Sequence, residues 1–517
     1  MGKFLRRIKP WQALVGYLCL YAAVSLSSLT RFPFVHSDES WLSGLTRHML
    51  CSGSVGVTEP FFDLKPRYPH AIKTLFHLLQ MLMLRLFGYH VGAFRLLSLL
   101  GALGALGVFH AILLRLTRRP WLAVAGTALL SLDVQFLYAS HFARAEMLVL
   151  PGMLGCFLAL GTGERRHPAW AAILTGLCIG LHPNSFVVAG LCGAVLALGQ
   201  GFRDWKDVLR KLALYTGIVA LFALAVIAVS LWMDGDFFRH YYGEYGADYQ
   251  VHGSLLEKLG ETGPYFQRLF EQVSGTYYTP DIRVQLLLFG AALLLGAVLL
   301  LMGRRHLRPT LCALFGIWLA MALMGRYGQP YVVFFFPFGY LLLAQLASLL
   351  GKRRGLALLT ALGIFTGYMT FSQVQPVLEQ PEQYDRYLGK IASVVPADAK
   401  TLGNLNAEYH FGDGKLLDYR NLPYLEREGL TLSQYLRSRQ VRYILYSSEL
   451  ELLYDLRPRW DHIYGDLSFL PELQRLLRQE CQLLYQFVDN QYGNRVVSYQ
   501  HTGREFTVSV YRFVPVP

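Results

Sequence analysis

Charged side chains and cysteine motifs are both scarce in this sequence. Asp, Glu, Lys and Arg make up 16% of its 517 residues, whereas soluble proteins usually carry about 25%. Seven cysteines are present, none of them in a Cys-x-x-Cys motif, and five lie inside apolar runs. The scarcity of charge excludes a large soluble core. The cysteine spacing indicates neither a disulfide framework nor a structural zinc site.

Acidic residues are also in deficit, because 35 Asp and Glu stand against 48 Lys and Arg and leave a net charge of +13. A nucleic-acid-binding protein with such a balance presents a basic face with stacking aromatic residues. Here the basic residues stand at the ends of apolar runs instead, as in cytoplasmic loops beside membrane spans. We therefore predict a membrane protein with no nucleic-acid partner.

Long apolar runs are abundant. A helix needs about 20 predominantly apolar residues to cross a bilayer, and a membrane protein repeats such runs with short polar loops between them. We predict about 11 transmembrane helices. They are Trp11–Thr30, Val91–Leu116, Trp121–Ala139, Ala145–Leu160, Pro168–Leu181, Ser185–Leu198, Leu212–Met233, Val284–Met302, Thr310–Met324, Gln329–Leu350 and Leu356–Phe371.

The segment Ala71–Phe87 decides the predicted topology. It is apolar but carries Lys73, His77, Gln80 and Arg85, which makes it polar for a span that faces lipid. If it lies along the interface as an amphipathic helix, every later basic cluster is cytoplasmic, as the excess of Lys and Arg on that side requires. Those clusters are Arg115/Arg118/Arg119, Arg165/Arg166, Arg203/Lys206/Arg210/Lys211, Arg304/Arg305/Arg308 and Lys352/Arg353/Arg354.

The composition changes after Phe371. Residues 373–517 mix charged residues with short apolar runs and amphipathic stretches, a pattern typical of alternating strands and helices. With a cytoplasmic N-terminus, an odd number of spans places this part outside. The predicted fold class is a polytopic α-helical membrane protein with juxtamembrane helices and a small C-terminal α/β extracytoplasmic domain. We expect a transmembrane domain at 1–372, with a first extracytoplasmic loop at 31–90, and the α/β domain at 373–517.

Ionisable residues gather in the loops that this topology places outside, where such groups are usually functional or paired. Asp38-Glu39 follows the first span. An ordinary interpretation makes Asp38 the N-cap of a helix over Trp41–Met49. Arg144 and Glu146 can likewise pair across a helix start. Other candidates are Lys65 in Lys65-Pro66-Arg67, His70, His182 before Pro183, Arg239, Arg326 and Tyr327.

The order of these short motifs resembles the GT-C class of membrane glycosyltransferases, which use polyprenyl-phosphate sugars. It is most similar to the branch that contains the protein O-mannosyltransferases and the lipid A aminoarabinose transferase. The matching motifs are Asp38-Glu39 after the first span, Lys65-Pro66 in the first loop, Phe87-Gly88 with Phe94-Arg95-Leu96-Leu97-Ser98 at the second span, and Ala143-Arg144-Ala145-Glu146 after the third. A departure is Lys65-Pro66-Arg67, where many relatives have a second proline.

The resemblance implies inverting transfer of a sugar from a polyprenyl-phosphate donor to an acceptor hydroxyl. A phosphate leaving group needs no protonation, so one carboxylate base suffices, and positive charge must stabilise the departing phosphate. We expect Asp38 to be the base, with Glu39 or Glu146 orienting the sugar or acceptor. The expected donor-phosphate ligands are Lys65, Arg144, Arg239, Arg326 and Tyr327, and His70 and His182 are the expected substrate-binding residues.

This interpretation requires no cofactor or metal, although His36 and Asp38 leave a divalent ion open as an alternative. The expected partners are the polyprenyl-phosphate sugar donor, membrane lipid and an acceptor that is an envelope glycan such as lipopolysaccharide, a lipid or a protein. The expected location is the inner membrane of a bacterium. A transporter or flippase of a lipid-linked sugar is the alternative function. It is disfavoured because we find no internal repeat and almost no charge in the middle of the spans.

Overall fold

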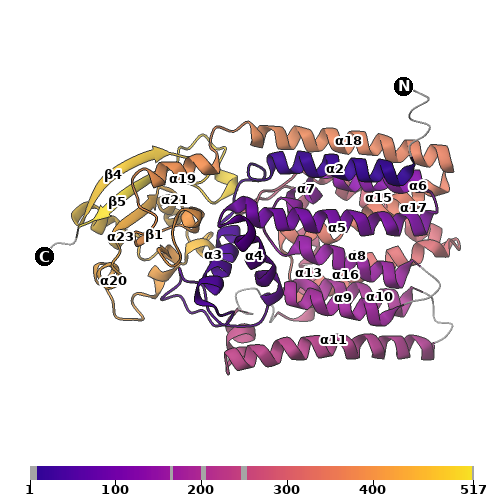
Figure 1. The fold of residues 1–517 in the computed structure, drawn as a ribbon, viewed down its shortest axis with the longest axis horizontal. Coiled ribbons are helices and arrows are strands. Elements are labelled where there is room, and N and C mark those ends of the chain that lie inside the picture. The colour runs from indigo at the N-terminus through magenta and orange to yellow at the C-terminus, as the bar shows by residue number, and fades with distance from the viewer. Residues whose placement is uncertain (1–8, 163–166, 200–204, 246–252, 515–517) are drawn as a thin grey trace.

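The computed structural model describes residues 9–162, 167–199, 205–245 and 253–514. Helices that lie side by side form one end of the molecule, a small sheet with its own helices forms the other, and two helices lie between them (Figure 1). The basic residues Arg165, Arg166 and Arg203 and the N-terminal residues 1–8 lie outside the described residues.

Seven helices are long and apolar enough to cross a membrane. Because their apolar runs are continuous, local sequence is sufficient to form them. The seven are α2 (Pro10–Ser28), α5 (Val91–Thr117), α11 (Trp205–Met233), α15 (Arg283–Leu301), α16 (Arg308–Met324), α17 (Phe336–Leu349) and α18 (Lys352–Leu378). The length of α16 includes the 3-10 turn η4 (Arg305–Leu307) before it, and that of α17 includes the 3-10 turn η5 (Gln329–Phe334).

The predicted span Trp121–Ala139 is not one straight helix. It is divided into α6 (Pro120–Ser131) and α7 (Val134–Ser140), which meet at an angle of 69°. Asp133 causes the break, because its carboxylate accepts the backbone N–H groups of Gln135 and Phe136 and thereby starts a new helix. The same carboxylate accepts hydrogen bonds from the Tyr340 hydroxyl at 2.7 Å and from the Gln285 amide at 3.1 Å.

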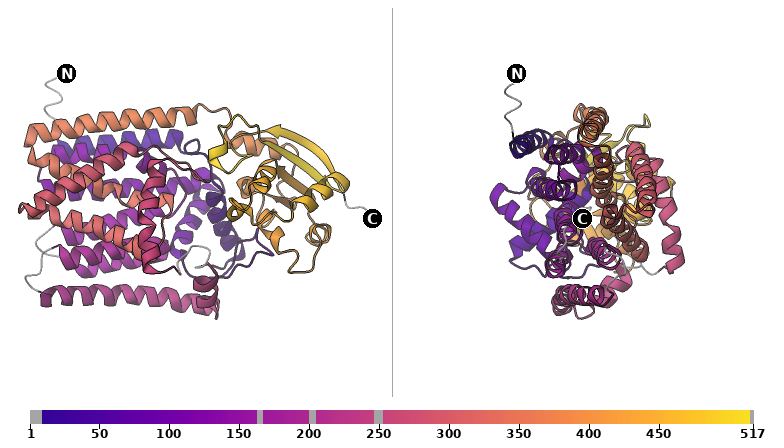
Figure 2. Two further views of the ribbon diagram at one scale, coloured as in Figure 1. Left: turned by 180° about the vertical axis from the view of Figure 1, so that it is seen from behind. Right: turned by 90° about the vertical axis from the view of Figure 1, so that its right-hand side faces the viewer.

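Three shorter apolar helices occupy the remaining predicted spans: α8 (Glu146–Gly161), α9 (Pro168–Leu181) and α10 (Phe186–Leu198), the last preceded by η1 (Pro183–Ser185). Each predicted span therefore corresponds to a helix or to the bent pair. The long helix α11 lies at the edge of the bundle (Figure 2), and only 6% of the residues in its 18-residue apolar stretch are buried. The chain is a multi-pass membrane protein.

The first loop contains two helices that separate the bundle from the sheet, α3 (Ser37–Ser52) and α4 (Thr74–Phe87). Helix α4 buries Phe76, His77, Gln80 and Met83 and exposes Leu78, Leu82 and Leu86. The exposed leucines face outward, and the polar residues His77 and Gln80 are buried with Phe76 and Met83 against the protein, as expected of a helix on a membrane surface. The loop that follows α11 holds the π-helix η3 (Phe238–Tyr245), α13 (Leu255–Gly260) and α14 (Thr262–Phe270).

The C-terminal part forms a five-stranded mixed sheet with the strand order β2-β1-β3-β5-β4. The parallel strands are β1 (Thr401–Gly403), β2 (Leu416–Asp418) and β3 (Tyr443–Ser447), and β5 (Thr507–Phe513) pairs antiparallel with β3 and with β4 (Cys481–Val488). Its helices are α19 (Tyr384–Ala392), η6 (Leu405–His410), η7 (Tyr419–Tyr424), α20 (Leu432–Ser438), α21 (Glu449–Asp455), α22 (Asp461–Tyr464), α23 (Leu470–Gln479) and η8 (Val497–Tyr499).

The C-terminal part packs directly on the first loop. Arg47 of α3 forms a buried ion pair with Glu408 of η6, and Asn421 accepts hydrogen bonds from three consecutive backbone N–H groups of residues 63–65. The predicted domain boundary at residue 372 falls inside α18, which continues to Leu378, so the division of the chain at that residue stays a prediction.

Candidate active site

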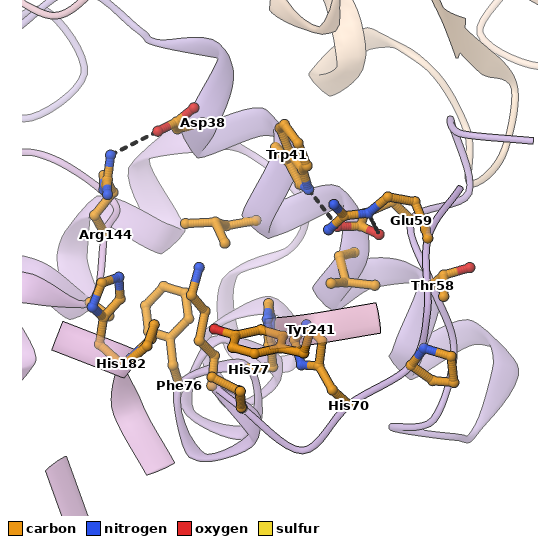
Figure 3. Close-up of a pocket in the computed structure, with 18 of the residues that line it drawn as sticks. Asp38, Trp41, Thr58, Glu59, His70, Phe76, His77, Arg144, His182 and Tyr241 are labelled. Carbon is orange, nitrogen blue, oxygen red and sulfur yellow. Dashed lines mark hydrogen bonds and ion pairs between the residues drawn. The ribbon is translucent and has the colours of Figure 1, made fainter. Parts of the chain in front are cut away.

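A cavity of about 390 Å³ lies where α3, α4 and the loop ends of the bundle meet. Its walls come from α3, residues 57–73, the segment around Arg144, the turn at His182 and the segments around Tyr241, Tyr277 and Arg326. Charged and aromatic side chains point into it from several directions (Figure 3). Regions far apart in the sequence thus build one chamber, lined by both apolar and charged side chains, at the end of an apolar bundle.

Asp38 lines this cavity from the first turn of α3. Its Oδ2 accepts hydrogen bonds from Arg144 and from the Tyr277 hydroxyl, both at 2.7 Å. Burial alone would raise the pKa of the carboxyl, but His36, Arg144 and the Tyr277 hydroxyl more than offset it and hold the pKa well below its usual range. Asp38 is therefore ionised at neutral pH, and its side chain keeps 27% of its surface exposed.

The start of α3 differs from the expectation that Asp38 is the N-cap. His36 is the cap, because its Nδ1 accepts the backbone N–H of Asp38 at 2.9 Å, and Glu39 closes the capping box by accepting the N–H of His36. The imidazole ring can reach this N–H, which leaves the Asp38 carboxylate free to face the cavity. Burial lowers the pKa of His36 to about 4, so the ring is neutral.

Arg144 is held in place by Glu146. The guanidinium lies 2.9 Å from the Glu146 carboxylate while its other terminal nitrogen contacts Asp38. Glu146 is buried and is not among the residues that line the cavity. Its carboxylate fixes the direction of the Arg144 side chain, which points toward Asp38 in Figure 3.

Three further cations line the cavity with Arg144: Lys73, Arg326 and, in an ion pair with Glu59, Arg67. Burial, reinforced by the positive charge of Arg144, lowers the pKa of Lys73 to about 8. Within the described part of the chain, no carboxylate lies at ion-pair distance from Lys73. The cavity wall near Asp38 therefore has an excess of positive charge.

The opposite wall is closer to electrical neutrality. Glu59 forms an ion pair with Arg67 and accepts a hydrogen bond from the Trp41 indole at 2.7 Å. Burial would raise the pKa of Glu59, but the Arg67 charge lowers it to about 2. Trp41, Glu59, His70 and Tyr241 lie together on this side in Figure 3.

The three cavity histidines are uncharged at neutral pH. Burial lowers the pKa of His70 to about 4 and that of His77 to about 3, and it lowers the pKa of His182 well below its usual range. His182 Nδ1 accepts the backbone N–H of Asn184 at 3.0 Å, and His77 Nδ1 contacts the Thr46 hydroxyl. These rings offer hydrogen-bonding groups to a ligand and no charge.

Five of the expected site residues do not line the cavity: Glu146, which pairs with Arg144 behind it, and Glu39, Lys65, Arg239 and Tyr327. Glu39 forms a fully buried ion pair with Arg95, and the Lys65 ammonium lies over the Phe62 ring at 5.5 Å. Arg239 is exposed on η3, and the Tyr327 hydroxyl donates to the backbone of Lys258. The cavity does bring together Asp38, Arg144, Arg326, His70 and His182.

Sequence reasoning missed Lys73, Tyr277 and the Glu59–Arg67 pair as cavity residues. Lys73 carried a signal, because it is a charge in an apolar segment. Tyr277 is one tyrosine among many in its loop, so nothing local distinguishes it. Among the described residues, no three His, Cys, Asp or Glu side chains are arranged to hold a metal ion, and both ring nitrogens of His36 already contact Asp38 N–H and the Thr276 hydroxyl.

Comparison with known proteins extends this picture. A model described as a family of unknown function (DUF6541) matches residues 142–340, and no curated protein matches the chain. Among solved structures, ArnT from Cupriavidus metallidurans in the apo state has a TM-score of 0.58 at 14% identity and covers 96% of this chain and 98% of its own.

Two more solved structures are similar. ArnT of the same organism bound to undecaprenyl phosphate has a TM-score of 0.55 at 13% identity, with 96% of this chain and 98% of its own covered. The apo oligosaccharyltransferase of Archaeoglobus fulgidus has a TM-score of 0.52 at 12% identity, with 85% and 70% covered. These similarities show that the chain has the GT-C membrane fold.

Proposed function

We propose that this protein transfers a sugar from a polyprenyl-phosphate donor to an acceptor hydroxyl, with inversion at the anomeric carbon. The observation that carries the proposal is the cavity that holds the ionised Asp38 carboxylate together with Lys73, Arg144 and Arg326, while its other carboxylate, Glu59, is paired with Arg67. A similar structure contains undecaprenyl phosphate, which belongs to the class of lipid that the proposed reaction releases from its donor. Lysine and arginine are the usual ligands of phosphate groups in proteins.

The reaction needs one base and no acid. The acceptor oxygen attacks the anomeric carbon, the bond from that carbon to the phosphate oxygen breaks, and its electron pair leaves with polyprenyl phosphate. The proton of the attacking hydroxyl passes to Asp38. A general base of this kind contributes about 10²–10⁴-fold to the rate.

The cations stabilise the charge that develops on the departing phosphate. Arg144, Lys73 and Arg326 supply positive charge from three separate segments, and removal of one such donor typically costs about 2.7–4 kcal/mol of the activation barrier. Glu146 holds Arg144 in its orientation and acts as a positioning residue. In this proposal Lys73 takes the role that sequence reasoning assigned to Lys65.

Donor binding also activates the base. In the free protein Arg144 and the Tyr277 hydroxyl both bind Asp38 Oδ2, which makes the carboxylate a weak base. A bound phosphate competes for the Arg144 guanidinium, and weakening of that contact raises the proton affinity of Asp38. The base therefore becomes stronger when the donor is in place.

The remaining parts of the proposal concern location and acceptor. We place the cavity on the extracytoplasmic side of a bacterial inner membrane, with the N-terminus in the cytoplasm and residues 373–517 as an extracytoplasmic domain. The basic clusters at the other ends of the spans support this orientation. The acceptor class is an envelope glycan, a lipid or a protein, and His70 and His182 contribute neutral hydrogen-bonding groups to the bound sugar or acceptor.

The test is transfer from a panel of radiolabelled polyprenyl-phosphate sugars by the detergent-purified protein, with Asp38→Asn beside it. Transfer should fall at least about 10²-fold in the variant. Donor binding should persist or tighten, because Arg144 loses one of its two carboxylate partners and keeps Glu146. Asp63→Asn is the matched control, since Asp63 lies in the same loop, pairs with Arg439 and does not line the cavity. Full activity of Asp38→Asn would overturn the assignment of the base. Donor binding without turnover by the wild type would favour transport of the lipid. Movement of the lipid-linked sugar across the membrane of liposomes that contain the protein would then be measured.

A further inference from the structure

A second, much smaller niche lies beside the active site, between the start of α3 and the loop that precedes β5. Its volume is about 10 Å³, room for roughly one water-sized group. Residues from four segments line it: 34–37, Thr276, Asn406 and the segment 491–500. The C-terminal part of the chain therefore forms one side of the niche. The other side includes Ser37, which directly precedes the candidate base Asp38 in the chain.

Four of the residues that line this niche carry a buried polar atom without a partner. The Asn406 Oδ1, Gln491 Nε2, Asn494 Nδ2 and Arg495 Nη1 atoms are all buried without a hydrogen-bond partner. The four side chains are only 1–9% exposed. Buried polar groups almost always have partners, and each group without one costs about 1–3 kcal/mol. Four such atoms around one small space indicate that a polar group fills it.

Arg495 is the cation in the lining of the niche. Arg495 donates from Nη2 to the Ser37 hydroxyl, and within the described residues no carboxylate lies at ion-pair distance from its guanidinium. The nearby Glu449 carboxylate accepts the backbone N–H groups of Arg495 and Val496 instead. Two of the other unpartnered atoms, on Gln491 and Asn494, are also donors. Three donors, one of them charged, favour an oxyanion.

The niche and the main cavity are neighbours across a thin wall. The ring of His36, which lines the niche, stacks on Tyr277 with 4.4 Å between ring centroids, and Tyr277 lines the cavity and binds Asp38. The His36 Nε2 contacts the Thr276 hydroxyl at 3.0 Å. The stacked rings of His36 and Tyr277 thus form the partition between the niche and the part of the cavity that holds Asp38, the proposed base.

We propose that the niche recognises an anionic group on the acceptor, either a carboxylate or a phosphate ester, by binding one of its oxygens between Arg495, Asn494 and Gln491. This inference rests on the proposed transferase function. It makes the C-terminal part of the chain a determinant of acceptor choice, with the anionic group anchored beside α3 and a nearby hydroxyl presented to Asp38. The shared chemistry is an oxyanion on an envelope glycan or lipid.

The test uses the full-length purified protein and a labelled donor with three portions of one bacterial envelope extract. One portion is untreated, one has its carboxylates reduced with carbodiimide and borohydride, and one is dephosphorylated. Transfer should be lost, by about tenfold or more in kcat/KM, with the portion that lacks the recognised group. The portion that fails identifies the source of the oxyanion.

The matched variant is Asn494→Asp. Asn494 Oδ1 accepts the N–H of Val496 at 2.9 Å, and Asp preserves that bond while replacing the inward donor by a negative oxygen beside Arg495. The acceptor KM should rise about tenfold or more, and the donor KM should stay within about twofold of the wild type. Gln491→Met, which removes a donor at similar volume, provides a second variant and should change the acceptor KM in the same direction.

Asn490→Asp is the control. Asn490 adjoins Gln491 in the chain but does not line the niche, and its Oδ1 accepts the backbone N–H of Phe506. Equal transfer to all three extract portions, or an unchanged acceptor KM in both folded niche variants, would show that the niche holds only an ordered water and would overturn this inference. Absence of any Asp38-dependent donor consumption would instead overturn the proposed function.

Discussion

Lys73 stands at the N-cap of α4 in the left-handed region of backbone conformation, with φ of 69°. This conformation costs a non-glycine residue about 1–2 kcal/mol relative to a right-handed one. The conformation occurs at a residue whose side chain lines the cavity near Asp38, Arg144 and Arg326. Strain of this kind clusters at functional sites, which supports the assignment of Lys73 to the donor phosphate.

The charge of Lys73 predicts an alkaline limit to donor use. Burial lowers its pKa to about 8, so the ammonium is present below pH 8 and is lost as pH rises through that value. The kcat/KM for the donor, which reports the free enzyme, should fall above about pH 8. In Lys73→Arg this fall should disappear, because arginine stays charged.

The pH profile of donor kcat/KM, measured between pH 6 and 10, tests this expectation. Lys65→Arg is the matched control, because Lys65 does not line the cavity, and its profile should follow the wild type. An alkaline limb that persists unchanged in Lys73→Arg would assign the limb to another group.

At the scale of elements, one buried ion pair sets the position of α3. The Arg95 guanidinium of α5 binds both carboxylate oxygens of Glu39 at 2.7 Å and also donates to the backbone carbonyls of Leu29 and Pro33. Glu39 accepts the N–H of Ala143 as well, next to Arg144. The pair therefore joins the first span, α3, α5 and the Arg144 segment into one rigid frame.

Glu39→Gln should destabilise the protein strongly. It leaves Arg95 buried without its counter-charge, and breaking a buried pair in this way typically costs about 3–5 kcal/mol. Thermal unfolding in detergent should show a large fall in Tm, with activity falling in parallel. The double variant Glu39→Leu/Arg95→Met should be more stable than Glu39→Gln, because no unpaired charge remains. A Glu39→Gln protein with unchanged Tm and no turnover would assign Glu39 a direct role in catalysis.

At the scale of the whole molecule, the C-terminal part shapes the cavity through the first loop. Asn421 Oδ1 accepts the N–H groups of Asp63, Leu64 and Lys65 at 3.1–3.2 Å, and its amide donates to the Phe61 carbonyl. These four hydrogen bonds hold residues 61–65, which directly precede Arg67 and His70 of the cavity wall. The sheet end therefore orders this part of the loop, while Tyr68 and Ala71 contact His240 and Ser230 on the bundle side.

Asn421→Ala should loosen this loop while the bundle stays folded. Loss of the four hydrogen bonds leaves residues 61–65 held by fewer contacts, among them the Asp63–Arg439 pair, so the donor KM should rise by about tenfold. Trypsin should then cleave after Arg67 faster than in the wild type, whereas the bond after Lys65 is protected by Pro66. Asn490→Ala, which removes a single hydrogen bond to the Phe506 N–H elsewhere in the C-terminal part, should leave cleavage at Arg67 unchanged. Equal cleavage rates in Asn421→Ala and wild type would contradict the conclusion that Asn421 orders this loop.

Local sequence determined the parts of this protein that depend on continuous runs. An apolar run of about 20 residues forms a membrane helix whatever surrounds it, so each predicted span corresponds to a helix or the bent pair. The break at Asp133 was missed because a single polar residue in an apolar run does not show whether its carboxylate will cap a new helix. The α/β character of the C-terminal part also followed from its short apolar runs.

Tertiary structure decided which charges meet. Asp38 and Glu39 are adjacent, but successive residues of a helix point about 100° apart, so one carboxylate faces the cavity while the other is buried against Arg95. Packing of α3 sets that rotation, and no pattern within the chain encodes it. The same holds for Lys65 and Lys73, for Tyr277 at Asp38 and for the niche at Arg495, because their partners lie in distant segments. Sequence alone determined the membrane helices and the order of the motifs; only long-range packing could choose the side chains that face one another.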